Sequence, residues 1–258
     1  MSIPTPVKGY DIREYVVETQ QSSELIEIAY QTIPNRRLER HPEGDSGDYI
    51  LVHQFTENRK GIMIADSNLP GKAGAEHARS ICHQVLDLIR TRRYFDPCEA
   101  LIKVAINEKQ SDPFCSLLYV DVLNAGRGKA GVSMCSAGHF FPIVYSSSLR
   151  MDTGDYEYPK NRGPAIGLPI RKPKFPKTAA LLRKDDYLVL FTDGITEAKD
   201  SENRELERHG LVGLIDSIIS GGAQKPSQIV EEAMVALRIC QDISKRSDDM
   251  SLAVIKIN

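Results

Sequence analysis

The chain has 258 residues, of which 41% are hydrophobic, and its formal net charge is −2. This composition indicates a soluble globular protein with one large domain or two small ones, and the near-neutral charge gives no reason to expect nucleic acid or a membrane as a partner. No apolar run is long enough to span a bilayer, and the N-terminus lacks the apolar core of a secretory signal. We therefore expect a cytoplasmic protein.

The cysteines are odd in number and widely spaced, and no two of them form a Cys-x-x-Cys pair. This pattern predicts reduced thiols and argues against both a disulfide framework and a zinc site. The cysteines are Cys82, Cys98, Cys115, Cys135 and Cys240.

The N-terminal part of the chain predicts a strand over residues 10–17, a short helix over 22–33 and a loop over 34–46. We expect an antiparallel hairpin within residues 49–66, because two apolar strands flank the polar turn ENRK. The main domain is accordingly assigned to residues 44–258.

Two helices follow the hairpin. The first is amphipathic, with apolar residues at helical spacing, and it carries His77 and His83, which we interpret as surface or packing residues. The second begins at Pro97, with Asp96 as its N-cap, and ends near Glu108. The apolar positions of the first helix are Ala78, Ile81, Cys82, Val85, Leu88 and Ile89.

Strands predicted over residues 114–123, 130–136 and 141–145 form a meander, with His139 in the turn before the last one. Residues 146–185 are rich in proline and basic side chains, so we expect a surface excursion, either a flap over the site or a partner contact.

A buried strand over residues 187–191 ends abruptly at Thr192-Asp193-Gly194. Helices over 211–219 and 226–239 come next, and the apolar segment after Asp248-Asp249 predicts a final buried strand. Short turns between strands imply antiparallel sheets, and the helix pairs must cover sheet faces. We predict an α+β fold of layered sheets and helices.

Carboxylates recur at the ends of these apolar strands. A single Asp-Gly is most often just a turn, but Asp48, Asp66, Asp193 and the pair Asp248-Asp249 occupy equivalent places. Hard cations such as Mg²⁺ and Mn²⁺ prefer carboxylate oxygens, and two of them can activate water and neutralise a phosphoryl group.

Two other hydrolase classes do not fit the sequence. A haloacid-dehalogenase-like phosphatase needs a second acid two residues from Asp193, where this chain has Phe191 and Ile195. The chain also lacks the Gly-x-Ser-x-Gly nucleophile motif and the glycine-lysine motif of a P-loop.

Six segments together resemble the metal-dependent Ser/Thr protein phosphatases of the type-2C superfamily, and more narrowly their bacterial SpoIIE/RsbU-type branch. The resemblance covers about residues 44–258 and implies a layered α-β-β-α sandwich of two antiparallel sheets flanked by helix pairs. The segments are GD (47–48), IAD with a following Gly-Lys (64–72), AGHFFP (137–142), GPAIGLP (163–169), LVLFTDGITEA (188–198) and SDDMS (247–251).

By this resemblance, Asp66 would bridge two Mn²⁺ or Mg²⁺ ions, and the Ser67 carbonyl would assist the second ion. Asp193 and Asp248 would complete the shell of the first ion. Asp48 would act directly or through a metal-bound water, and Asp249 would support its neighbour. The Gly138-His139 pair would be structural.

The resemblance also implies a substrate and a reaction. A metal-activated water would hydrolyse phosphoserine or phosphothreonine on a small anti-sigma-factor antagonist, within a partner-switching pathway. Residues 1–43 form an N-terminal extension too short for a sensor domain, so we expect regulation by a separate partner or by homodimerisation through this segment.

The chain departs from the family pattern at three places. The loop 67–73 after Asp66 is about two residues longer and has lost a glycine, Leu51 replaces a further Asp, and Ser251 stands where Thr is commoner. All main carboxylates are present, so we predict a working enzyme. Two alternatives stay open: an inactive module that binds a regulatory partner, and a small-molecule phosphohydrolase. The basic residues Arg36, Arg37 and Arg40 are candidates for phosphate binding.

Overall fold

The computed structural model describes most of the chain, and the sequence-predicted strand over 10–17 and most of the loop over 34–46 lie outside the described residues. No helix among the described residues is long and apolar enough to cross a membrane. The described residues are 21–22, 25–34, 46–91, 96–108, 112–146, 151–152, 161–200, 202–240 and 248–258.

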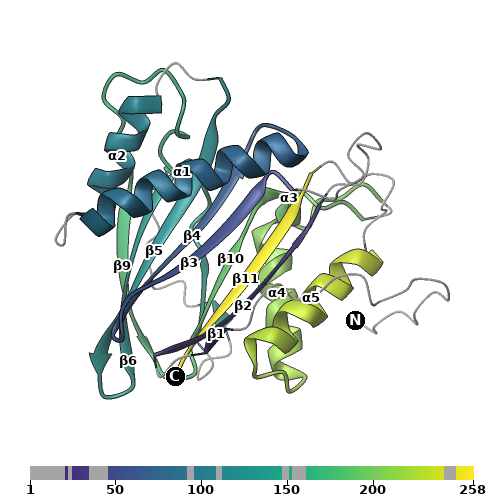
Figure 1. Ribbon diagram of the computed structural model, residues 1–258. Helices are drawn as coiled ribbons and strands as arrows, with labels where there is room; N and C mark the ends of the chain where they lie inside the picture. Colours follow the sequence, from purple (N-terminus) through teal and green to yellow (C-terminus); the bar gives the residue numbers. More distant parts are fainter. Residues whose placement is uncertain are drawn as a thin grey trace.

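Two antiparallel sheets stack face to face, and a helix pair covers the outer face of each (Figure 1). This arrangement is the α-β-β-α sandwich that the sequence predicts. One sheet runs in the order β1 (Gln21–Ser22), β2 (Ile26–Ile33), β11 (Met250–Ile257), β10 (Tyr187–Phe191), β7 (Ile143–Ser146) and β8 (Met151–Asp152). The other runs β3 (Asp48–Thr56), β4 (Arg59–Ser67), β5 (Cys115–Gly126), β6 (Lys129–Ala137) and β9 (Lys177–Arg183).

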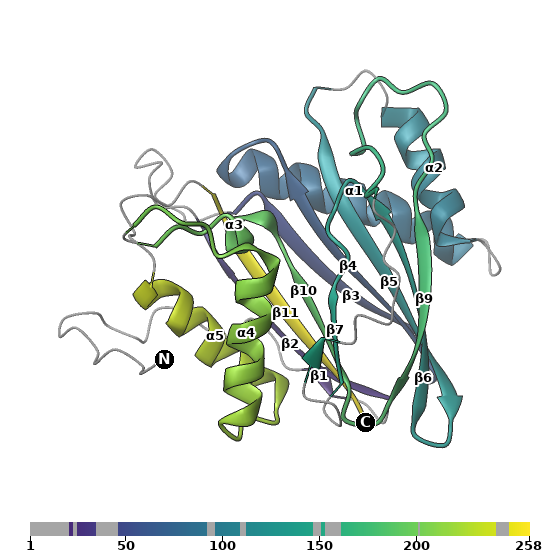
Figure 2. The same cartoon turned by 180° about the vertical axis from the view of Figure 1, so that it is seen from behind.

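The helices divide between the two outer faces, as the view from behind in Figure 2 also shows. Helices α1 (Gly71–Thr91) and α2 (Pro97–Glu108) pack on the β3–β9 sheet, while α4 (Glu207–Ser220) and α5 (Pro226–Cys240) pack on the β1–β8 sheet. The one-turn α3 (Asp193–Thr196) follows β10. The predicted cap of α2 is confirmed, because the Cys98 N–H donates to Asp96 Oδ1 at 2.9 Å.

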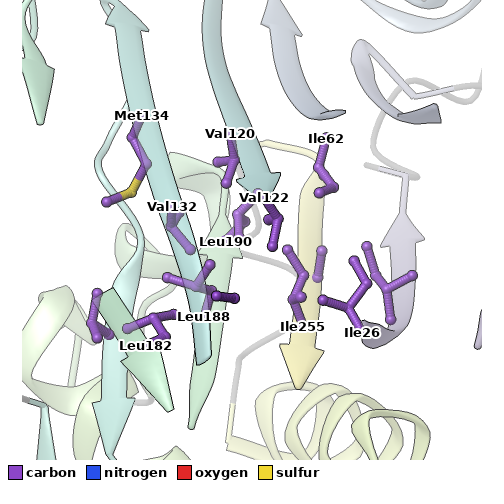
Figure 3. Packing of buried hydrophobic residues seen from close by; sticks show 14 of the residues in the cluster. Ile26, Ile62, Val120, Val122, Val132, Met134, Leu182, Leu188, Leu190 and Ile255 are labelled. Atoms are coloured by element: carbon purple, nitrogen blue, oxygen red, sulfur yellow. The ribbon is translucent and has the colours of Figure 1, made fainter. Parts of the chain in front are cut away.

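The space between the sheets is filled by aliphatic side chains from both (Figure 3). Alternate residues of the central strands point to opposite faces, so a strand that is covered on both sides is apolar at nearly every position. In β4, Ile62 and Ile64 enter the core between the sheets, whereas Met63 and Ala65 pack against the α1–α2 layer.

The predicted helix over residues 22–33 is wrong. Residues 26–33 form β2, which pairs with β11 along its whole length. Ile26 and Ile28 enter the core between the sheets, while Ala29 and Ile33 face α4 and α5, so both faces of the strand are buried. This strand lies within the segment 1–43, yet it belongs to the sandwich.

Three further predictions need correction. The segment over 141–145 does not continue the β5–β6 hairpin as a meander, because β7 crosses to the other sheet and pairs with β10. The excursion over 146–185 contains β9, which pairs with β6. Cys98 and Cys135 are joined by a disulfide between the first turn of α2 and β6, contrary to the prediction of reduced thiols.

The physical reason for the disulfide is the packing of α2 on β6. The two cysteines are 37 residues apart in sequence, but their Cα atoms lie 5.8 Å apart once the helix covers the sheet. Sequence spacing alone cannot reveal a pairing of this kind.

Candidate active site

The carboxylates predicted from the sequence gather at one end of the sandwich. Asp48 opens β3 and Asp66 is the last residue but one of β4, and these two residues are directly paired in the ladder. Asp193 begins α3 just after β10, and Asp248 and Asp249 precede β11. Figure 1 shows α3 and the start of β11 at the end of the sandwich where α1 begins.

Strand alternation turns two of these carboxylates inward. Ile50 and Ile64, each two residues away on its own strand, belong to the core between the sheets. Asp48 and Asp66 therefore lie on the same inner face, at its edge. They face the end of the other sheet, which supplies Asp193, Asp248 and Asp249.

Hydrogen bonds connect the two sheets at this edge. The Thr192 Oγ1–H donates to Asp48 Oδ2 at 2.9 Å, and the same Oγ1 accepts the Ser251 N–H at 2.9 Å. The Gly47 N–H donates to Asp249 Oδ2 at 2.6 Å. These contacts hold Asp48 and Asp249 in fixed orientations across the junction between the sheets.

Thr192 is a site residue that the sequence analysis did not single out. It is fully buried between Phe191 and Asp193, and its hydroxyl links β10 to both β3 and β11. Its position directly before a strand-end Asp is the signal that could have identified it. Ser251, one of the departures from the family pattern, places its Oγ 2.6 Å from Thr32 Oγ1 on β2, so its hydroxyl is bonded within the sheet.

Burial and crowded negative charge raise the pKa values of the carboxyls. Burial raises the pKa of Asp66 to about 8, with further contributions from Asp193, Asp248 and Asp249. Burial also raises the pKa of Asp48 well above its usual range, and the charges of Asp66 and Asp249 add to this effect. Asp248 is raised to a pKa of about 6, mainly by burial.

The loop after Asp66 is held tightly against the site in spite of its unusual length. The Ser67 Oγ lies 2.8 Å from His77 Nδ1 on α1, and the Ser67 N–H donates to the Gly47 carbonyl at 3.2 Å. A Cβ on Gly74 would collide with the Leu69 carbonyl and would lie 2.8 Å from the Gly47 Cα. His77 therefore anchors the loop to the helix, in agreement with its interpretation as a packing residue.

The other side of this loop is fastened to β5. The Asn68 N–H donates to the Phe114 carbonyl at 3.1 Å, and the Phe114 N–H donates to Asn68 Oδ1 at 2.9 Å. Gly71, the first residue of α1, has a φ of 58°, a conformation that favours glycine. The longer loop thus has a defined shape, and it keeps Ser67 beside Asp66.

His139 is buried beside the site. Its Nδ1 lies 3.1 Å from the Phe140 carbonyl, and its Nε2 has no hydrogen-bond partner among the described residues. Burial lowers its pKa to about 4, so the ring is neutral near pH 7. Gly138 has a φ of 80°, and a Cβ there would lie 2.9 Å from the Ala165 nitrogen. This close approach explains the glycine.

The donor set fits hard divalent cations, because it consists of carboxylate oxygens from two sheets and one nearby backbone carbonyl. In the described part of the chain, no three His, Cys, Asp or Glu side chains already stand close enough to share one metal ion. The fit rests instead on the charge at the site. Burial, and after it the charges of Asp193, Asp248 and Asp249, raise the pKa of Asp66, and a nearby cation would favour the charged carboxylate again.

The fold is that of PP2C-type phosphatase domains. The SiaA-PP2C domain of Pseudomonas aeruginosa has a TM-score of 0.67 at 15% identity, covering 90% of this chain and 85% of that chain. The RsbU and RsbW domains of a Mycobacterium tuberculosis protein have a TM-score of 0.72 at 19% identity, covering 91% of this chain and 62% of that chain.

The sequence comparison is more specific. The family described as Stage II sporulation protein E (SpoIIE) matches residues 72–258, and this chain belongs to that family. A relative, the phosphoserine phosphatase RsbU of Bacillus subtilis (strain 168), is 25% identical over 237 residues, which is 90% of this chain. This chain spans 64% of the length of that relative.

Proposed function

We propose that this protein is a Mn²⁺- or Mg²⁺-dependent phosphatase of phosphoserine and phosphothreonine in proteins. The observation that carries the proposal is the convergence of strand-end carboxylates from both sheets at one edge, in a chain of the SpoIIE family. The proposed metal-site residues are Asp48, Asp66, Ser67, Asp193, Asp248 and Asp249.

The cations would supply positive charge for phosphoryl oxygens and lower the pKa of water that attacks the phosphorus. The residues of this chain would prepare the site for them. Thr192 and the Gly47 N–H orient Asp48 and Asp249 by hydrogen bonds across the sheets, and the Ser67–His77 contact keeps the Ser67 carbonyl beside Asp66. Because these contacts are made without substrate, Asp48 and Asp249 are already oriented before cations bind, and the remaining carboxylates would close around the ions.

The proposed substrate is a phosphorylated anti-sigma-factor antagonist or a similar signalling protein. In support of this, the B. subtilis relative is named a phosphoserine phosphatase, and the M. tuberculosis structure combines RsbU and RsbW domains. A cytoplasmic location would suit such a substrate. The disulfide between Cys98 and Cys135 argues against a cytoplasmic location, because such bonds are uncommon in the cytoplasm.

The first test is hydrolysis of p-nitrophenyl phosphate with Mn²⁺, Mg²⁺ or EDTA, for the wild-type protein and for Asp193→Asn and Asp248→Asn. Asp121→Asn is the matched control, because Asp121 pairs with Arg59 on the opposite face of β5 and does not contact the site. Metal-dependent turnover that is lost in both site variants and kept in the control would support the proposal.

A second candidate is an inactive module that binds a regulatory partner, motivated by the unusual loop after Asp66. Calorimetric Mn²⁺ binding separates the two on the same sample. A folded protein that neither binds Mn²⁺ nor turns over a phosphoester is such a module. A preference for a phosphorylated metabolite over any phosphoprotein would indicate a small-molecule phosphohydrolase instead.

We also propose regulation by a separate partner or through homodimerisation involving the N-terminal segment. A truncation that tests this must keep β2, because β2 pairs with β11 in the sandwich. Deletion of residues 1–20 meets this condition. Full activity as a monomer, unchanged by that deletion, would contradict the proposal.

A further inference from the structure

One described arginine, Arg162, lies near enough to Asp193 that both residues influence the same neighbouring side chains. The Arg162 backbone is fixed at the end of β6, because its carbonyl accepts the Gly138 N–H at 2.8 Å and the Ser136 Oγ–H at 3.0 Å. Its side chain is exposed. The arginines considered from the sequence, Arg36, Arg37 and Arg40, lie outside the described residues.

Two aromatic rings connect Arg162 to the last residue of β10. The guanidinium carbon of Arg162 lies 3.8 Å from the centroid of the Phe140 ring. The Phe140 ring is 5.6 Å from the ring of Phe191, centroid to centroid. Phe191 ends β10, and Asp193 begins α3 two residues later. These contacts therefore link Arg162 to the end of the strand that precedes Asp193.

The charges of Arg162 and Asp193 both affect the pKa values of two neighbouring side chains, His139 and Glu197. The pKa of His139 is lowered mainly by burial, and Asp193 raises it while Arg162 lowers it. The pKa of Glu197 is raised mainly by burial, with Asp193 adding to the rise and Arg162 opposing it. Arg162 and Asp193 thus lie within electrostatic reach of the same pair of side chains.

Arg208 also lies near Phe191, but its guanidinium is hydrogen-bonded, unlike that of Arg162. Arg208 stands 5.8 Å from the Phe191 centroid, but its two terminal nitrogens donate to the carbonyls of Phe141 and Pro142. The guanidinium of Arg162 makes no hydrogen bond or ion pair with a residue that the structure describes. Stacking holds the plane of the guanidinium and leaves the N–H groups at its rim available.

We propose that Arg162 binds the non-bridging oxygens of the substrate's phosphoryl group beside Asp193. This inference rests on the proposed phosphatase function and names the residue that recognises the phosphate in it. A guanidinium offers two parallel N–H donors that match two phosphate oxygens, which an ammonium group cannot do.

The test compares Arg162→Ala and Arg162→Lys with Arg171→Ala, an exposed arginine on the same segment. Calorimetry measures the binding of inorganic phosphate to the Mn²⁺-loaded protein, and the affinity for Mn²⁺ is measured separately. For Arg162→Ala we expect phosphate binding to weaken by roughly ten- to a hundredfold, with a similar rise in KM for p-nitrophenyl phosphate. Mn²⁺ affinity and the melting temperature should stay unchanged, and Arg162→Lys should lose less.

Three results would overturn the inference. One is equal phosphate affinity in Arg162→Ala and Arg171→Ala. Another is a loss of Mn²⁺ affinity that parallels the loss of phosphate affinity, because Arg162 would then support the metal site. The third is a wild-type protein that binds Mn²⁺ but no phosphate. If the wild-type protein binds phosphate through Arg162 yet shows no turnover, the inference stands and the proposed phosphatase activity fails.

Discussion

Along β3 and β4, the residues that face the other sheet change from Ile50 and Ile64 to Asp48 and Asp66 within two positions. The isoleucines belong to the core between the sheets, whose aliphatic packing Figure 3 shows, whereas the aspartates have pKa values that burial and, after it, neighbouring carboxyls raise. On the same strands, the isoleucines thus stabilise the fold, whereas the aspartates two positions away destabilise it. This contrast indicates that the sandwich core holds the carboxylates together against their repulsion.

The largest expected effect concerns the site end. Asp66→Asn should lower metal-dependent turnover at least about a hundredfold, because it removes a carboxylate that would hold the cations. The same change should raise the free energy of unfolding of the metal-free protein, because it removes a buried carboxyl that must take up a proton on folding. Steady-state kinetics and urea unfolding in EDTA measure the two effects. If the variant loses both activity and metal-free stability, the statement that Asp66 destabilises the metal-free fold is wrong.

Ile64→Ala, two residues earlier on the same face, should do the opposite. Ile64 is fully buried between the sheets, so the substitution should cost about 2–5 kcal/mol of unfolding free energy. Turnover per folded molecule should change little. Leu181→Ala is the control, because Leu181 is 53% exposed and its loss should cost less than about 0.5 kcal/mol. Equal losses at the two positions would show that the core between the sheets is not what stabilises the fold.

The pH dependence of stability should also distinguish the two regions. Asp66 has a pKa of about 8 in the folded state against an ordinary value of 3.8, so between these values the native state holds a proton that the unfolded state has lost. Stability of the metal-free protein should therefore fall as pH rises from about 4 to 8, by on the order of a few kcal/mol. Denaturant titrations across this range measure it. Asp66→Asn should flatten the profile, and an unchanged slope would exclude Asp66 as its source.

The smallest effect is expected at the junction of the two regions. Thr192→Val keeps the shape of the side chain but removes the hydroxyl that donates to Asp48 and accepts from the Ser251 N–H. The loss should be about 1–2 kcal/mol of unfolding free energy, accompanied by weaker Mn²⁺ binding. Thr192→Ser retains the hydroxyl and should restore most of both. A Ser variant that binds Mn²⁺ as weakly as the Val variant would show that the hydroxyl does not set the Mn²⁺ affinity.

Local patterns were sufficient for much of the fold. The alternation and apolar runs of β3, β4, β5 and β11 predicted strands that the structure confirms, and the spacing of apolar residues predicted α1. Pro97 with Asp96 predicted the start of α2 to the residue. These features depend on neighbours in the sequence, so the sequence alone could reveal them.

Elements whose environment comes from distant segments were missed. The apolar positions of β2 are compatible with a helix or a strand. The segment is a strand because it pairs with β11 and because both of its faces are buried in the protein. Similarly, β7 joins β10 in the other sheet, and β9 forms because β6 offers an open edge. Short apolar segments take the structure that their partners impose.

For the candidate site, the sequence by itself determined which carboxylates stand at strand ends, because each follows or precedes an apolar run. Only the tertiary structure decided how they meet: Asp48 opposite Asp66, Thr192 bonded across the sheets, Arg162 stacked on Phe140, and Cys98 joined to Cys135. The physical reason is that a strand end is a local property of the chain. Proximity between strand ends depends on which sheet each strand joins and how the sheets stack.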